Sequence, residues 1–154
     1  MGRLFDSVSA LLNICHYNDY EGEAAVGLEY TAGQADYTYE LAIPVKEEAG
    51  KFIGQTDELF MQILDGIERG IGTDALAYGF HMAVAYWILE SVRCAEKNHI
   101  HFDQIALSGG TFQNGILLDK TIELLEKNGY NVYINEKVPS GDGGLCLGQA
   151  YLLR

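Results

Sequence analysis

A glycine-rich segment between a predicted strand and a predicted helix is the first place where this chain could do chemistry. Residues Ser108–Asn114 read SGGTFQN. Because glycine has no Cβ, the backbone amides of Gly109 and Gly110 can approach a ligand closely, and the start of the following helix favours an anion or a polar ribose edge. Asn114 could hydrogen-bond a base or a sugar. A tight turn without a ligand fits equally well, since the pattern is neither GxGxxG nor a Walker loop.

A second glycine-rich segment, Ser140–Gly144 (SGDGG), places one carboxylate at the start of the last predicted helix. Asp142 could cap that helix by accepting backbone N–H bonds. It could also be a hard-oxygen ligand for a divalent metal that bridges phosphates. Three glycines around Asp142 are more than a cap needs, but the residues alone leave both roles open.

Asp6 and the histidines are weaker candidates. Asp6 lies near the first turn of the predicted N-terminal helix, where it could favour the helix dipole or accept hydrogen bonds from ribose hydroxyls. His81 lies within the most apolar helix, and we expect it to be a core histidine with satisfied hydrogen bonds. His16, His99 and His101 show no spacing that predicts a site.

Composition narrows the classes of partner. The 154 residues carry a formal net charge of -12, which argues against nucleic acid and against an anionic membrane surface, because both require clustered Lys and Arg. No stretch is long and apolar enough for a transmembrane helix. The cysteines at 15, 94 and 146 form no CxxC and suit a reducing compartment. We therefore expect one domain in the cytoplasm, with neither a nucleic-acid nor a membrane partner.

Hydrophobic periodicity predicts mostly helices in the first two thirds of the chain. Predicted helices cover residues 2–16, 21–30, 56–67 and 73–98, and the last of these is apolar on nearly every side. Residues 37–45 alternate in the manner of a strand, with 51–53 as a hairpin partner. The helical pattern starts at Gly2 without a preceding leader, so we expect the chain to be a fragment of a larger protein.

The last fifty residues alternate strands and helices. A strand over 104–107, a helix over 114–127, a strand over 130–134 and a final helix ending at Leu153 predict an α/β unit with parallel strands and a right-handed crossover. Both glycine-rich segments follow the strands of this unit.

Four sequence blocks, taken together in this order, resemble a known family. They are Gly2–Leu12, Tyr20–Ala25, Leu107–Asn114 and Val138–Ala150. Their order and spacing resemble the C-terminal end of the HypF family, the carbamoyltransferases of nickel–iron hydrogenase maturation. The resemblance spans nearly the whole chain and is weakest over residues 34–74.

The resemblance implies an RNase H-like lobe of the actin, sugar kinase and heat-shock chaperone superfamily, here the C-terminal lobe of the family's kinase-like domain. It implies carbamoyl phosphate and ATP as substrates, from which the family makes carbamoyl-adenylate. The carbamoyl group then passes to the C-terminal cysteine of the partner HypE. The alternatives are a lobe of a tRNA threonylcarbamoyl transferase-like or sugar-kinase-like ATP-binding protein, and a non-catalytic interaction module.

The resemblance also implies roles for individual residues. Asp142 matches the family's metal- and phosphate-contacting aspartate, the one residue we assign to catalysis. The nucleotide-binding positions are matched by Gly2, Asp6, Glu21, Gly109, Gly110 and Asn114. Gly2 and Asp6 match the segment near the ribose, and Glu21 lies in the nearby Tyr-Glu-Gly block. Gly109, Gly110 and Asn114 match the loop that lies along the adenosine.

One departure from the family pattern concerns the metal. The family's paired metal histidines belong to the preceding lobe, and none of the four histidines of this chain matches them. A divalent metal would therefore be shared with residues outside this chain, because a single carboxylate supplies too few ligands. We expect the isolated chain to lack carbamoylation activity.

Overall fold

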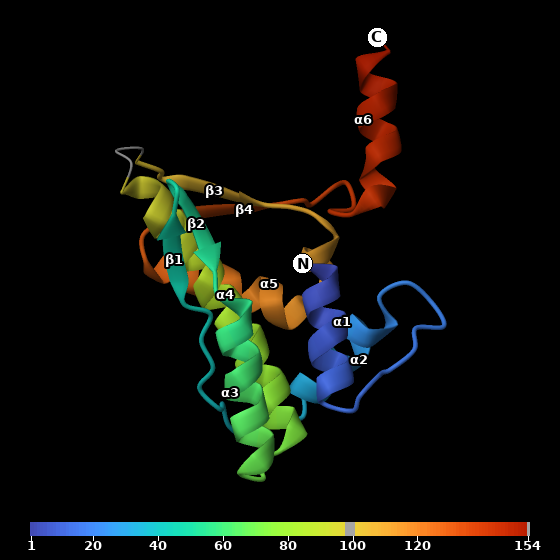
Figure 1. The fold of residues 1–154 in the computed structure, drawn as a ribbon. Helices are drawn as coiled ribbons and strands as arrows, with labels where there is room; N and C mark the ends of the chain where they lie inside the picture. Colours follow the sequence, from blue (N-terminus) through green and yellow to red (C-terminus); the bar gives the residue numbers. More distant parts are fainter. Residues whose placement is uncertain (98–100, 154) are drawn as a thin grey trace.

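A long central helix, α4 (Thr73–Glu96), carries the core of the fold. The computed structural model describes residues 1–97 and 101–153. Helices α1 (Gly2–Leu11), α2 (Glu23–Ala32), α3 (Thr56–Glu68) and α5 (Gly115–Lys127) gather around α4 (Figure 1). Most of the inward-facing residues of α4 are fully buried, including Leu76, Phe80 and Val84. The prediction that this helix is buried against several neighbours is confirmed.

The first two helices begin and end at different residues from those predicted. Helix α1 ends at Leu11 instead of His16, because Asn13 adopts a left-handed conformation with φ 57° and the Ile14 N–H donates to the Ser9 carbonyl at 2.9 Å. Helix α2 begins at Glu23 instead of Glu21, after Gly22 with φ 85°. Glu21 therefore lies in the connecting segment just before the helix.

The strand predicted over residues 37–45 is wrong for most of its length. The hairpin consists of β1 (Val45–Glu48) and β2 (Lys51–Gly54), which pair antiparallel across Ala49 and Gly50. The alternation before Val45 arises because Leu41 and Ile43 point into the core. Between them, Ala42 is held by the Gln62 side-chain amide, which accepts from the Ala42 N–H and donates to its carbonyl, both at 3.0 Å. A side chain here takes the place of a neighbouring strand.

The parallel strands and the connecting helix of the predicted α/β unit are confirmed. Strands β3 (Gln104–Leu107) and β4 (Asn131–Ile134) pair in parallel, with Gln104 opposite Asn131, and α5 connects them. The α/β class is therefore observed, whereas the RNase H-like lobe stays a prediction. Within the described ranges, the parallel sheet has only these two strands.

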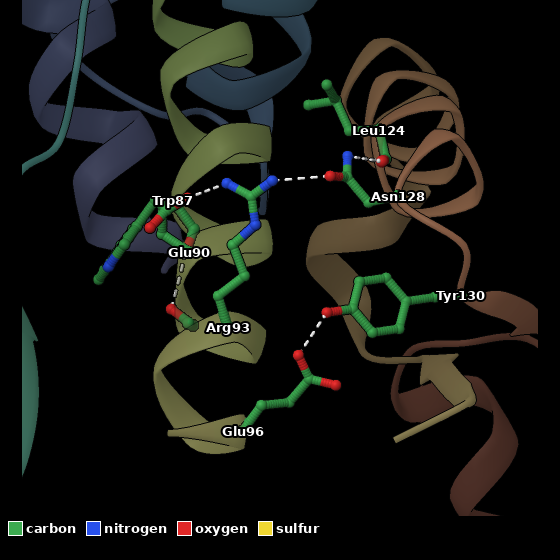
Figure 2. Close-up of polar contacts among 8 residues, drawn as sticks. Trp87, Glu90, Arg93, Glu96, Leu124, Asn128 and Tyr130 are labelled. Carbon is green, nitrogen blue, oxygen red and sulfur yellow. Dashed lines mark hydrogen bonds and ion pairs between the residues drawn. The ribbon is translucent and has the colours of Figure 1, made fainter. Parts of the chain in front are cut away.

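Polar contacts tie the outer end of α4 to the α/β unit (Figure 2). The Arg93 guanidinium pairs with Glu90 and donates to Asn128 Oδ1 at 2.7 Å, at the end of α5. The Tyr130 hydroxyl donates to Glu96 at 2.8 Å. The Arg93 and Glu90 side chains are partly exposed, so their ion pair adds little stability, whereas Tyr130 is buried. Together they fix how the unit, and hence the loop after β3, sits on α4.

The C-terminal helix differs from the rest of the fold. A short 3-10 turn, η2 (Asp142–Gly144), leads into α6 (Leu145–Leu152), and neither has a buried residue. Figure 1 shows α6 projecting away from the other helices. Asn98, the predicted end of the long central helix, and His99 lie outside the described residues. No described helix is both long enough and apolar enough to cross a bilayer.

Candidate functional site

A cavity of about 670 Å³ opens where four separate segments meet. Its walls come from the start of α1, the segment entering α2, the loop after β3 and the loop after β4. This volume lies within the range that is usual for small-molecule sites. Six of the predicted site residues line it: Gly2, Asp6, Glu21, Gly110, Asn114 and Asp142. Sequence blocks that are far apart in the chain thus form one site.

Gly109 is the predicted residue that does not line the cavity. It has φ 104° and ψ 159°, a conformation that strongly favours glycine. Its N–H donates to the Ser140 carbonyl at 2.9 Å and so joins the two glycine-rich loops. The neighbouring Gly110 is open, since a Cβ added there would meet no atom within 4 Å. Gly109 shapes the loop, and Gly110 leaves space for a ligand.

Asn114 is held on the cavity wall by two hydrogen bonds of its side chain. Its Oδ1 accepts from the Leu117 N–H at 2.8 Å and caps α5. Its Nδ2 lies 2.9 Å from Nε2 of His81. Asn114 was predicted as a ligand contact, and the structure shows that it is also the N-cap of α5.

His81 is fully buried, and both of its ring nitrogens have partners. Nδ1 lies 2.7 Å from the Ala77 carbonyl, which can only accept, so Nδ1 carries the proton and Nε2 accepts from Asn114. Burial lowers the pKa of His81 and favours this neutral form. The expectation of a core histidine with satisfied hydrogen bonds is confirmed. Its partner lies 33 residues away, so no local motif could have revealed the pair.

Glu29 is a cavity residue that the sequence analysis did not identify. It lies on α2, and its carboxylate accepts from the Gly115 N–H at 2.7 Å and from the Ile116 N–H at 3.4 Å. A carboxylate at a helix N-terminus is favourable because it meets unpaired N–H groups and the positive end of the helix dipole. Together with Asn114 it satisfies the first turn of α5. That helix end is therefore already occupied by protein groups.

Asp142 has no comparable partner. It is exposed, and in residues 1–97 and 101–153 its side chain makes no hydrogen bond to protein and caps neither η2 nor α6. The helix-cap interpretation is therefore wrong for this structure. No three His, Cys, Asp or Glu side chains gather as a metal site within the same ranges. Asp142 lines the cavity as an exposed carboxylate.

The charge on the cavity wall is unbalanced. Among the described residues that line the cavity, Arg3 is the one cation, against four carboxylates, at Asp6, Glu21, Glu29 and Asp142. Such a wall opposes a bare anion, because like charges at short range repel. A phosphate-bearing ligand would need a cation with it or positive groups from elsewhere. Hydroxyl and amine donors, in contrast, would find several acceptors.

Comparison with known proteins gives one family over nearly the whole chain. The family described as carbamoyltransferase, Kae1-like domain, second subdomain, matches residues 1–149. The probable carbamoyltransferase HypF of Methanocaldococcus jannaschii is 28% identical over 99% of this chain and 20% of its own length. Carbamoyltransferase HypF of Rhodobacter capsulatus is 35% identical over 97% of this chain and 18% of its own length. The chain spans about a fifth of the length of these relatives.

Two solved structures share the fold. Full-length HypF in the phosphate- and nucleotide-bound form superposes with a TM-score of 0.86 at 33% identity, over 99% of this chain and 20% of that protein. HypF of T. kodakarensis gives a TM-score of 0.84 at 32% identity, over 99% of this chain and 19% of that protein. The likeness includes the projecting α6, since nearly all of the chain is matched.

Proposed function

Because this chain belongs to the HypF carbamoyltransferase family, as the second subdomain of the Kae1-like domain, we propose that it forms one wall of a nucleotide site in a carbamoyltransferase. The observation that supports this most is the cavity itself. It brings four separate family-like segments together, with the carboxylates of Asp6, Glu21 and Asp142 among the residues that line it. A set of unrelated turns would have no reason to converge in this way.

The chemistry of the walls suggests how the nucleotide lies. Adenosine would follow the open backbone of Gly110 towards Asn114, and the ribose hydroxyls would donate to Asp6 and Glu21. The phosphates would lie near Asp142 and the glycines beside it. They would not sit at the start of α5, because Glu29 and Asn114 already accept from the N–H groups there.

The phosphates require positive charge that Asp142 and the glycines beside it do not supply. Asp142 has the oxygen chemistry of a Mg²⁺-type ligand, and it would hold a divalent cation together with ligands from outside the 154 residues. A bound cation of this kind offsets the negative charge that develops on phosphate oxygens. In this proposal Asp142 serves both metal binding and catalysis.

The proposed overall reaction is that of the whole family protein. Carbamoyl phosphate, ATP and water would give carbamoyl-adenylate, pyrophosphate and phosphate. The carbamoyl group would then pass from the adenylate to the thiol of the C-terminal cysteine of HypE, with release of AMP, in nickel–iron hydrogenase maturation. The isolated chain would not catalyse this reaction, because it carries one side of the site. We place the protein in the cytoplasm, without a nucleic-acid or membrane partner.

Titration of the 154-residue chain with AMP tests the nucleotide site. We expect a dissociation constant in the millimolar range, corresponding to about 4 kcal/mol, because one wall buries only one side of the ligand. In nuclear magnetic resonance spectra, the shifted amides should cluster at Gly110, Asn114 and Glu21. The proposal would be contradicted by amide shifts confined to other parts of the chain, by no binding at AMP concentrations well above the millimolar range, or by a submicromolar dissociation constant.

A further inference from the structure

We infer that His81 is a positioning residue for the proposed nucleotide site, because it fixes the direction of the Asn114 amide without reaching the cavity. The inference rests on the proposed function, since Asn114 matters to a ligand only if the cavity binds one. His81 is fully buried and does not line the cavity. Asn114 does line it, so any effect of His81 on the ligand passes through Asn114.

The proton on the His81 ring determines how the amide points. With Nδ1–H donating to the Ala77 carbonyl, Nε2 presents a lone pair to Asn114 at 2.9 Å. The amide then has to turn its NH₂ towards the ring and its Oδ1 towards the Leu117 N–H. A flipped amide would place oxygen against the Nε2 lone pair and NH₂ against an N–H donor. Both hydrogen bonds would be lost together.

The surrounding core holds the imidazole in place. The ring packs edge-on against Phe5, with centroids 5.6 Å apart, and against Phe80 at the same centroid distance. Phe5 and Phe80 also contact each other edge-on at 4.9 Å. Rotation of the imidazole would have to displace both aromatic rings. The orientation of Asn114 is therefore set by the packing of α1 on α4.

A fixed amide gives the ligand a defined pattern of hydrogen-bonding groups. An asparagine side chain offers two N–H donors and two oxygen lone pairs. One donor goes to His81 and one lone pair to Leu117, which leaves one N–H and one lone pair. This pair suits a donor–acceptor edge such as that of a nucleobase or a sugar. A freely flipping amide would present no such fixed pattern.

Two substitutions of His81 separate positioning from simple packing. In His81→Gln, the side-chain oxygen can replace Nε2 as acceptor for Asn114, whereas His81→Leu has similar bulk and no acceptor. We expect AMP affinity of the 154-residue chain to stay within about threefold in His81→Gln and to fall roughly tenfold in His81→Leu, the worth of one hydrogen bond. Equal AMP affinity in the two variants would overturn the inference.

A second measurement needs no variant and no ligand. In ¹⁵N-labelled wild-type protein, the imidazole signals should report a neutral ring protonated at Nδ1, and a scalar coupling should connect Asn114 Nδ2 with His81 Nε2 across the hydrogen bond. A ring protonated at Nε2, or absence of the coupling, would overturn the inference even if both variants unfold. Failure of AMP to bind wild type, with the coupling present, would instead refute the proposed function.

Discussion

The two glycine-rich loops reach the same cavity but are supported in opposite ways. In the loop after β3, Asn114 is buried and hydrogen-bonded to His81 and to α5, and Glu29 holds the adjoining helix turn. In the loop after β4, Asp142 is exposed, and no described residue supports its side chain. This second loop leads into α6, which has no buried residue.

This contrast indicates which part of the site the chain completes by itself. A group that is locked by core packing has its geometry before any ligand arrives. A free carboxylate gains a fixed position only from a ligand, a metal or another part of a longer protein. The loop after β3 is therefore held in place by this chain alone. In the loop after β4, the Asp142 side chain needs a further group to fix its position. Substitution of the hydrogen-bonded Asn114 in the first loop should change stability, and substitution of Asp142 in the second should change activity.

The largest expected effect is loss of activity on Asp142→Ala in a longer protein that contains this subdomain. Carbamoyl-phosphate-dependent pyrophosphate exchange should fall on the order of 100-fold or more, because the proposed metal ligand is removed. The free energy of unfolding should change by less than about 0.5 kcal/mol, as is usual for an exposed side chain. Asp119→Ala, an exposed acid outside the cavity, is the matched control. A lower melting temperature with near-normal exchange would instead show that Asp142 is structural.

Asn114→Ala should have the opposite signature. Loss of a helix cap costs about 1 kcal/mol, and the unpaired buried Nε2 of His81 adds about 1 to 2 kcal/mol. Denaturant unfolding should therefore show roughly 2 to 3 kcal/mol of destabilisation. Asn128→Ala, at the exposed end of the same helix, should cost less than about 1 kcal/mol. Equal stability of the two alanine variants would show that the hydrogen bonds of Asn114 with His81 and Leu117 do not stabilise the fold.

The sequence predicted the parts of this comparison that depend on local patterns. Alternating strand and helix signals located β3, α5 and β4, and three glycines around Asp142 marked the second loop. The alternation before Val45 misled the prediction, because Leu41 and Ile43 face the core from a segment paired by a side chain. Periodicity reports which residues face inward, but it does not report what the backbone pairs with.

The hydrogen bonds that Glu29 and His81 make with the start of α5 could not be predicted, because the partners are distant in the sequence. Glu29 contacts a backbone amide 86 residues away, and His81 contacts Asn114 across 33 residues. Within its own helix, neither Glu29 nor His81 is part of a local motif that indicates these contacts. Only the packing of α2 and α4 against α5 brings the three side chains together.

Adjacent glycines of the first loop should respond differently to a methyl group. Gly109→Ala should cost roughly 1 to 2 kcal/mol, because its φ of 104° is unfavourable for any L side chain. Gly110→Ala should leave the free energy of unfolding nearly unchanged, since the added Cβ meets no atom within 4 Å. It should nevertheless weaken AMP binding, because the methyl group occupies cavity space. Melting curves and an AMP titration of both variants measure the two effects, and the reverse pattern would contradict the placement of the loop.

The smallest expected effect is a change in the pH dependence of stability. Burial lowers the pKa of folded His81 below the ordinary value of 6.5, although the Ala77 hydrogen bond and the charge of Glu29 oppose this. Between the folded pKa and 6.5 the unfolded chain binds more protons, so the free energy of unfolding rises with pH in that window. The contribution of neutral His81 is complete above about pH 6.5 and is lost as the pH falls below it.

Denaturant unfolding from pH 8 to 5 should therefore show a shallower decline of the free energy of unfolding in His81→Gln than in wild type. The carboxylates of Glu96 and Glu123 also have lowered pKa values, through Tyr130 and Lys120, but they are present in both proteins and cancel in the comparison. Identical slopes for the two proteins would mean that the imidazole accepts a proton in place, and the hydrogen bond from Asn114 would then not constrain it.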